Sequence, residues 1–315
     1  MCAWRVVVTA RSFAETDVGW EALAEMGADV VRALPQAGAA PGDLIALLAD
    51  ADAAIVGTEI VDQAVLDAGR RLKIVVKAGA GVDNIDVAAA DAAGVRVGSV
   101  PGANAGAVAD YAIALMLAAA RRVCEVDRAV RRGEWSRFLG VDLFGSTVGV
   151  AGLGHVGRAV CERLSGFSPV LLGTDVMVDE DWARTAGVRV TDIDEIVESC
   201  DFISLHLPLT EQTRGLINRD TLERMKPHAI IVNTARGALI NPDALYEALA
   251  GRWIGGAALD VFDSEPLGDD RFRTLDNVVL SSHNASYSND GISRTVLGAV
   301  RQVQEAFHAE RAGAQ

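Results

Sequence analysis

The sequence predicts an α/β protein built from two units, each with a parallel β-sheet. Three observations lead to this prediction. Short β-branched runs alternate with Ala-rich helical runs, which is the βαβ rhythm of a parallel sheet. The rhythm occurs twice, before and after a long amphipathic segment at 105–123 that follows a Pro-Gly break. Finally, the chain has 315 residues, half of them hydrophobic, which is enough for two domains with full cores.

The expected elements follow in chain order. In the first series, helices are expected at 19–26 (GWEALAEM) and 64–69 (AVLDAG), and strands at 4–10 (WRVVVTA), 53–58 (AAIVGT), 72–79 (LKIVVKAG) and 94–100 (GVRVGSV). The strands of the second series are expected at 146–154 (STVGVAGLG), 169–175 (PVLLGTD), 202–208 (FISLHLP), 229–235 (AIIVNTA), 255–262 (GGAALDVF) and 277–283 (NVVLSSH). The polar tail at 306–315 is expected to fray.

Charge and composition exclude several classes of function. There are 29 Lys and Arg against 43 Asp and Glu, and the net charge of −14 disfavours binding to nucleic acid or to an anionic membrane. The chain has no signal-peptide pattern and no apolar run of about 18 residues, so we expect a cytoplasmic protein without a membrane span. The cysteines form no CxxC pair and have no histidine partners, so we expect neither a disulfide nor a metal site at Cys2, Cys124, Cys161 and Cys200.

The segment VAGLGHVGRAV at 150–160 carries a glycine motif at the end of a predicted strand. Gly152 would allow a tight turn, Gly154 would let the backbone approach a pyrophosphate, and Gly157 would let a helix starting near Val156 lie against the strand. Asp175 ends the next strand, 18 residues after Gly157. Its carboxylate would accept the ribose hydroxyls and repel a 2′-phosphate, which favours NAD over NADP; alternatively, it is an ordinary strand-end residue that caps a turn.

Several segments together resemble the D-isomer-specific 2-hydroxyacid dehydrogenases, and in particular the D-3-phosphoglycerate dehydrogenases. They extend over nearly the whole chain: AGAGVDNID (78–86), VPGANAGAVADYAIALMLAAAR (100–121), GSTVGVAGLGHVGR (145–158), CDFISLHLPLTEQTRGLIN (200–218), MKPHAIIVNTARGALIN (225–241) and GAALDVFDSEP (256–266). The resemblance implies a flavodoxin-like substrate domain made of 1–99 and 287–315, and a Rossmann-like NAD-binding domain at 100–286. The active site would lie in the cleft between these domains.

Hydride transfer from a secondary alcohol needs a base for the hydroxyl proton and a cation for the substrate carboxylate. The resemblance assigns Arg236 as the anion binder, Glu265 as the partner of the histidine, and His283 as the general acid/base. A carboxylate that is hydrogen-bonded to an imidazole orients the ring and stabilises its charged form. Taken singly, the three could instead be a strand-end charge, a turn carboxylate and a surface imidazole.

Further cofactor and substrate contacts are expected on the same basis. For NAD, beyond the glycines, Asp175, Arg236 and His283, they are His155, Val156, His206, Pro208, Thr234, Ala235, Asp260 and Ala285. Backbone N–H groups of Ala78, Gly79, Ala80 and Gly81 would hold the substrate carboxylate. Lys77 stands where phosphoglycerate dehydrogenases carry an arginine that helps to hold the phosphate. It is either a contact to the distal group of the substrate or a solvated strand-end lysine.

These observations predict an NAD-dependent oxidoreductase that acts on a small anionic 2-hydroxy or 2-keto acid, which could carry a phosphate or phosphonate. Arg137 is a second candidate contact for the phosphate or phosphonate. Asn284, directly after His283, adds a hydrogen-bond donor and acceptor to the expected pocket. The alternatives are a corepressor-like NAD-sensing protein and a formate- or phosphite-type dehydrogenase. We expect a homodimer built on 105–123 and the arm that follows. The chain ends soon after the returning helix, so we expect no regulatory domain.

Overall fold

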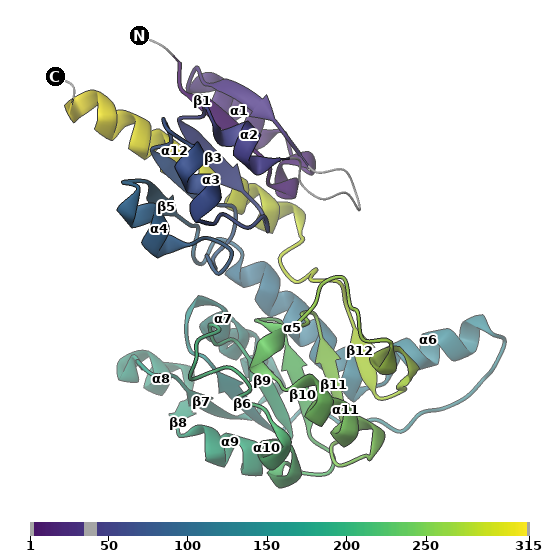
Figure 1. Ribbon diagram of the computed structural model, residues 1–315. Helices are drawn as coiled ribbons and strands as arrows, with labels where there is room; N and C mark the ends of the chain where they lie inside the picture. Colours follow the sequence, from purple (N-terminus) through teal and green to yellow (C-terminus); the bar gives the residue numbers. More distant parts are fainter. Residues whose placement is uncertain (1–2, 35–42, 314–315) are drawn as a thin grey trace. The chain divides into compact units, whose positions relative to one another are not determined.

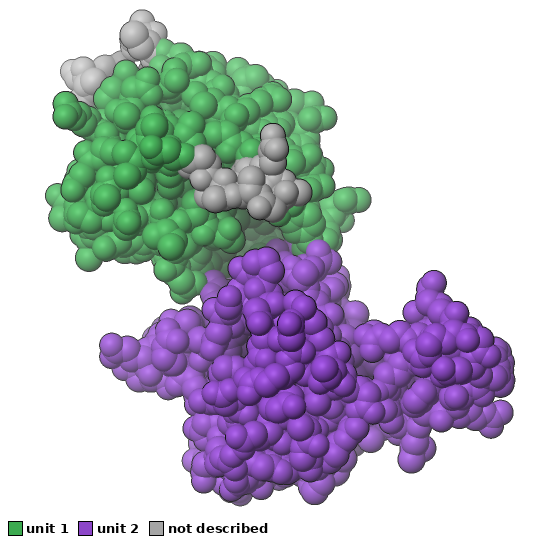
Figure 2. Space-filling model, turned by 45° about the vertical axis from the view of Figure 1, so that its right-hand side comes forward, with its two compact units in different colours: residues 1–104, 287–315 green, residues 105–286 purple. Residues whose placement is uncertain are grey.

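The computed structural model describes residues 3–34 and 43–313, which form two compact units. Unit 1 comprises Met1–Asn104 and Tyr287–Gln315, and unit 2 comprises Ala105–Ser286 (Figure 2). Both units are α/β, as the sequence predicts.

The described part of unit 1 forms a sheet of five parallel strands in the order β2-β1-β3-β4-β5. The strands are β1 (Arg5–Val8), β2 (Asp29–Arg32), β3 (Ala53–Val56), β4 (Ile74–Lys77) and β5 (Arg96–Gly98). The helices are α1 (Val18–Glu25), α2 (Leu44–Leu48), α3 (Gln63–Ala68), α4 (Val87–Ala92) and α12 (Asn289–Gly313), with a 3-10 turn at Arg11–Ala14. This strand order is that of flavodoxin-like sheets.

Helices cover both faces of this sheet, which explains why its strands are continuous apolar runs rather than alternating ones. Val6 and Val8 pack with residues of α1 and α12, whereas Val7 between them packs with residues of α2 and α3 on the other face. The long helix α12 packs beside α1 and contacts β3 and β4 (Figure 1). All four residues of β3 are buried.

The described part of unit 2 forms a sheet of seven parallel strands in the order β12-β11-β10-β9-β6-β7-β8. The strands are β6 (Thr147–Ala151), β7 (Val170–Thr174), β8 (Val188–Val190), β9 (Phe202–Leu205), β10 (Ile230–Asn233), β11 (Gly256–Leu259) and β12 (Val278–Leu280). The helices are α5 (Ala105–Ala120), α6 (Val123–Arg131), α7 (His155–Leu164), α8 (Glu180–Ala186), α9 (Ile193–Ser199), α10 (Arg219–Arg224) and α11 (Pro242–Ala250), with 3-10 turns at Ser165–Phe167, Gly237–Leu239 and Asp270–Thr274.

The strand order of unit 2 reverses between β6 and β9, which are neighbours in the sheet although two strands separate them in the chain. Ala151 at the end of β6 pairs with Leu205 at the end of β9. In open α/β sheets, ligands bind outside the carboxyl ends of the strands at such a reversal. The topology therefore places a candidate site where the glycine motif follows β6.

Three features differ from the sequence-based expectations. The sequence does not predict the edge strands β2 and β8, because they are short and only partly buried. The helix expected over 105–123 ends at Ala120, since Arg122 adopts a left-handed backbone (φ 54°) before α6 begins. The expectation of a frayed tail is wrong for 306–313, because α12 continues to Gly313, Ala306 is buried, and the ring of Phe307 meets Trp4 edge-on at 5.4 Å; residues 314–315 lie outside the described residues.

The described residues contain no helix long and apolar enough to cross a membrane. Three cysteines are free thiols, and Cys2 lies outside the described residues. Burial raises the pKa values of Cys161 and Cys200 to about 12, so both are neutral thiols packed in the core of unit 2. Within the described ranges, no three His, Cys, Asp or Glu side chains group as metal ligands.

Candidate active site

The glycine motif forms the turn between β6 and α7. Gly152 has φ of +99°, which favours glycine, and Gly157 lies so close to this turn that a Cβ on it would be 1.8 Å from the carbonyl oxygen of Gly152. Gly154 is the N-cap of α7 and has open space at the position of a Cβ. No side chain caps the helix there. The N–H groups at the start of α7, beginning with His155 and Val156, can therefore receive a phosphate.

Asp175 follows β7 and is held by the glycine turn. One carboxylate oxygen, Oδ2, accepts the N–H of Leu153 at 2.6 Å, and the other, Oδ1, accepts the N–H of Val176 at 2.7 Å. Arg158 from α7 donates to the carbonyl oxygen of Leu153 at 3.0 Å, and its charge is paired with Asp179 at 3.2 Å. The carboxylate of Asp175 is thus fixed beside the turn.

The carboxyl ends of β9 and β10 carry the next group of predicted residues. Burial lowers the pKa of His206 to about 4, so the ring is neutral at physiological pH, and its Nε2 bonds to Ser204 Oγ at 2.8 Å. Pro208 is exposed two residues further on. Thr234 is nine-tenths buried, and its hydroxyl bonds to no described residue. Because a buried hydroxyl without a partner is costly, Thr234 fits a polar group of a bound nucleotide.

Asp260, at the end of β11, is fully buried and binds the backbone around His283. Its carboxylate accepts the N–H groups of Asn284 (2.8 Å) and Ala285 (2.9 Å), and its carbonyl oxygen accepts the N–H of His283 (2.8 Å). His283 has φ of +55°, an uncommon conformation for a residue other than glycine. Asp260 therefore holds the histidine loop in its shape, a contribution that sequence motifs do not show.

His283 and Glu265 form a hydrogen-bonded pair: Nδ1 lies 2.7 Å from Oε2. Burial raises the pKa of Glu265, but the bond to His283, the N–H of Phe262 and the charges of His283 and Arg236 outweigh it, so the pKa is below its usual value. An ionised carboxylate only accepts hydrogen bonds, so Nδ1 carries the donated proton. This leaves Nε2 as the ring nitrogen that could exchange a proton with a ligand.

Arg236 lies in the loop between β10 and α11, close enough for its charge to act on Glu265. Its Nη1 donates to the carbonyl oxygen of Ala235 at 2.7 Å, and Asn233 Nδ2 donates to the carbonyl oxygen of Arg236 at 2.8 Å. The next residue, Gly237, packs against the Phe262–Asp263 backbone, where a Cβ would be 2.1 Å from a carbonyl carbon. Asn233 and Gly237, which the motifs did not single out, thus help to position Arg236.

The predicted substrate turn lies in unit 1, after β4. The N–H of Ala78 donates to Val56 and that of Gly79 to Lys77, both at 2.9 Å. The N–H groups of Ala80 and Gly81 make no bond to the described residues. Of the four N–H groups expected to hold the substrate carboxylate, those of Ala80 and Gly81 are therefore available to a ligand without breaking a bond of the described residues.

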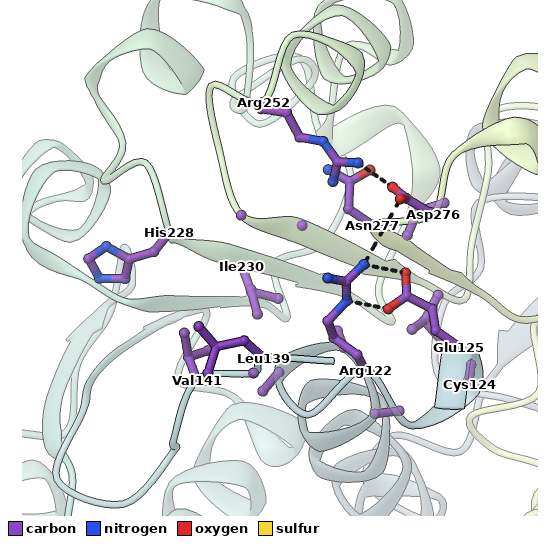
Figure 3. A pocket seen from close by; sticks show the side chains of 18 of the residues that line it. Arg122, Cys124, Glu125, Leu139, Val141, His228, Ile230, Arg252, Asp276 and Asn277 are labelled. Carbon is purple, nitrogen blue, oxygen red and sulfur yellow. Dashed lines mark hydrogen bonds and ion pairs between the residues drawn. The ribbon is translucent and has the colours of Figure 1, made fainter. Parts of the chain in front are cut away.

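A pocket of about 250 Å³ lies at the opposite, amino end of β10, β11 and β12 (Figure 3). Four of its charged groups pair with one another: Arg122 forms hydrogen bonds to Glu125, and Asp276 pairs with Arg252 and, at 4.0 Å, with Arg122. This pocket is remote in the sheet from the glycine motif, and it contains none of the residues predicted for catalysis. The candidate active site is therefore the carboxyl edge of the sheet.

Comparison with known proteins agrees with this fold. A family model described as "D-isomer specific 2-hydroxyacid dehydrogenase, NAD binding domain" matches residues 113–285. A glyoxylate reductase of Korarchaeum cryptofilum is 44% identical over 244 residues, which is 75% of this chain and 74% of that protein. A D-3-phosphoglycerate dehydrogenase of Methanocaldococcus jannaschii is 40% identical over 275 residues, 86% of this chain but 52% of the relative. The chain thus spans about half the length of the phosphoglycerate dehydrogenase that it matches.

Among solved structures, the TT0316 protein of Thermus thermophilus superposes with a TM-score of 0.87 at 32% identity and covers 97% of both chains. The similarity therefore extends over both units. The chain belongs to the D-isomer specific 2-hydroxyacid dehydrogenase family, whose members are NAD(P)-dependent oxidoreductases that act on CH–OH groups.

Proposed function

We propose that this protein is an NAD-dependent D-2-hydroxyacid dehydrogenase that interconverts a small 2-hydroxy acid and its 2-keto acid. The observation that carries the proposal is the His283–Glu265 pair at 2.7 Å, with the charge of Arg236 acting on it, at the sheet edge that also bears the glycine turn. This combination supplies a proton donor, an anion binder and a dinucleotide turn.

When bound, the dinucleotide would supply or accept the hydride at the α-carbon of the substrate. His283 would donate the proton on Nε2 to the carbonyl oxygen during reduction and take it back during oxidation. Arg236 would bind the substrate carboxylate and polarise the carbonyl. Glu265 would keep the ring oriented through Nδ1 and stabilise the imidazolium, while Asp260 would hold the histidine loop.

The proposal is tested with a panel of 2-keto acids and NADH, followed by the absorbance at 340 nm. The panel includes glyoxylate, hydroxypyruvate, pyruvate and a phosphorylated member. We expect steady oxidation of NADH with at least one of them. Binding of NADH without turnover of any keto acid, together with no reduction of NAD by formate or phosphite, would instead favour an NAD-sensing protein.

We propose NAD rather than NADP because the fixed carboxylate of Asp175 would lie against a 2′-phosphate. The expected preference in kcat/KM is at least about tenfold, which corresponds to about 1.4 kcal/mol. Asp175→Asn keeps an acceptor oxygen for the N–H of Leu153 but removes the charge, so this preference should fall by about tenfold. Asp181 on α8 is an exposed carboxylate, so Asp181→Asn is the matched control and should leave the cofactor preference unchanged. Equal use of both cofactors by the parent protein would overturn the assignment.

We also propose a homodimer that is formed through the arm after α5. Most of the apolar surface of α5 packs within unit 2, whereas the arm leaves Trp135, Leu139 and Phe144 between 72% and 93% exposed. In Figure 1, α6 and the chain after it project from the body of unit 2. Large apolar side chains that are exposed along one projecting segment indicate an interface.

Sedimentation at micromolar concentration should therefore give twice the chain mass of 33.1 kDa. Replacing both Trp135 and Leu139 by serine should shift the equilibrium to the monomer, since the buried apolar area is lost. Val170 on β7 is also an exposed apolar residue, so Val170→Ser is the control and should leave the dimer intact. A monomeric parent protein would contradict this assembly.

A further inference from the structure

The chain leaves the sheet of unit 2 just before His283. The N–H of Ser281 donates to the carbonyl oxygen of Leu259 at 2.9 Å, which continues the parallel pairing of β11 and β12. Two residues later a regular parallel ladder would bond the N–H of His283 to Val261, but that N–H donates to Asp260 instead. Ser281 is therefore the last residue that the sheet holds in strand register, and the left-handed φ of +55° at His283 follows soon after.

Alternate residues of β12 face opposite sides of the sheet. Val278 and Leu280 pack in the core on the side of α11, whereas Val279 packs with residues of α5 on the other side. Because side chains alternate along a strand, the side chain of Ser281 lies on the same side as Val279. The helix α5 crosses this side of the sheet, where it contacts β10, β11 and β12 (Figure 1). Ser281 therefore faces α5 at the point where the strand ends.

Tyr111 on α5 bonds to this serine. Its hydroxyl oxygen lies 2.7 Å from Ser281 Oγ, in a hydrogen bond for which either hydroxyl can be the donor. The ring of Tyr111 is half-buried and packs against the core between α5 and the sheet. The hydroxyl is thus carried by an anchored side chain, and it fixes the end of β12 at the place where the backbone ladder ends.

The histidine loop therefore has two supports outside its own backbone. Asp260 binds the N–H of His283 and the two N–H groups that follow. Tyr111 binds Ser281, two residues before His283. The ring of His283 bonds to Glu265 at 2.7 Å, and the strength of such a bond depends on distance and angle. A shift of the chain at Ser281 would move the ring relative to the carboxylate, because only one residue lies between Ser281 and His283.

We infer that Tyr111 is a positioning residue for the reaction: through Ser281 it places the ring of His283 against Glu265. This inference rests on the proposed function, in which His283 is the proton donor, and deepens it. Tyr111 acts on the ring only through the chain of the histidine loop. Its hydroxyl should therefore contribute to the rate of the proton-coupled step and not to the binding of NADH.

The test begins with Tyr111→Phe, which removes the hydroxyl and keeps the ring in the core. The single-turnover rate of NADH oxidation by a saturating keto acid should fall by about tenfold, while the affinity for NADH stays within about threefold. Ser281→Ala should cause the same loss, and the protein with both substitutions should lose no more than either alone, because they remove one shared bond. Ser281→Thr keeps a hydroxyl and should retain the rate within about threefold of the parent value.

The control is Tyr246→Phe, which removes a tyrosine hydroxyl from α11 on the other side of the sheet. It should leave the single-turnover rate at the parent value. Thermal unfolding followed by circular dichroism shows which variants are folded.

The pH profile separates positioning from general support of the fold. Glu265 would stabilise the protonated ring, so a weakened bond should make reduction begin to fall at a lower pH in Tyr111→Phe than in the parent. In a protein that already carries Glu265→Gln there is no carboxylate charge to misplace. Tyr111→Phe should therefore cause no further shift of the profile in that protein.

A folded Tyr111→Phe protein with the parent rate would overturn the inference. Additive losses from Tyr111→Phe and Ser281→Ala would also overturn it, as would a lower rate with an unmoved pH profile. Absence of turnover with every keto acid in the parent protein, or a parent rate in His283→Ala, would instead overturn the proposed dehydrogenase function.

Discussion

His283→Ala is expected to lower kcat for reduction of a 2-keto acid by about 10²–10⁴-fold, the usual contribution of a positioned acid or base. Nε2 is the nitrogen of the ring free to exchange a proton, because Nδ1 is bonded to Glu265 at 2.7 Å. The affinity for NADH should stay within about threefold of the parent value, since the glycine turn and Asp175 lie on other strands. Steady-state rates at 340 nm and a fluorescence titration with NADH measure the two quantities.

Two further variants separate chemistry from backbone effects. Asn tolerates the left-handed φ of +55° at position 283, so His283→Asn keeps the loop geometry and should lose as much activity as His283→Ala. His228→Ala removes an exposed imidazole that is paired with Asp201 at 2.9 Å, and it should leave kcat near the parent value. If His283→Asn turned over at the parent rate, His283 would not be the acid.

Glu265→Gln is expected to move the pH dependence of reduction rather than to abolish turnover. The interaction with His283 that helps to lower the pKa of Glu265 favours the imidazolium by the same free energy, because the coupling is reciprocal. Gln can still accept the bond from Nδ1 but no longer stabilises the positive charge. Reduction needs protonated His283, so its rate should begin to fall at a lower pH than in the parent.

The direction for oxidation is also fixed by this argument. Oxidation needs the neutral ring, so its acidic limb should extend to lower pH in Glu265→Gln than in the parent. Asp263 is an exposed carboxylate in the same loop. Asp263→Asn is therefore the control for a general change of charge, and it should shift neither the reductive nor the oxidative pH profile. Profiles of kcat/KM between about pH 5 and 9 provide the measurement. An unmoved reductive profile in Glu265→Gln would show that the pair does not set the protonation of His283.

The central strands of both sheets could be predicted from the sequence because they are buried on two faces and read as apolar runs, as in β3 and β9. The edge strands could not, since β2 and β8 are short and half-exposed. Whether the polar tail is helical also depends on tertiary packing. Ala306 and Phe307 give no strong local signal, whereas in the structure Trp4 and the core of unit 1 pack against that part of α12.

For the candidate site, motifs predicted which residues follow each strand, and the structure brings Glu265 and His283 together as a pair. What could not be predicted are residues that act through burial or close packing. Asp260 was expected to contact the cofactor, whereas its carboxylate also binds the loop of His283.

The most direct test of the central claim is a single-turnover experiment in which the protein, saturated with NADH, is mixed with a 2-keto acid that the panel identifies. The account predicts loss of one equivalent of NADH absorbance at 340 nm per site in the parent protein, with formation of the D-hydroxy acid where the product is chiral. His283→Asn should bind NADH with similar affinity but show this decay slowed by about 10²–10⁴-fold. Equal decay rates in the two proteins, or an L-configured product, would contradict the account.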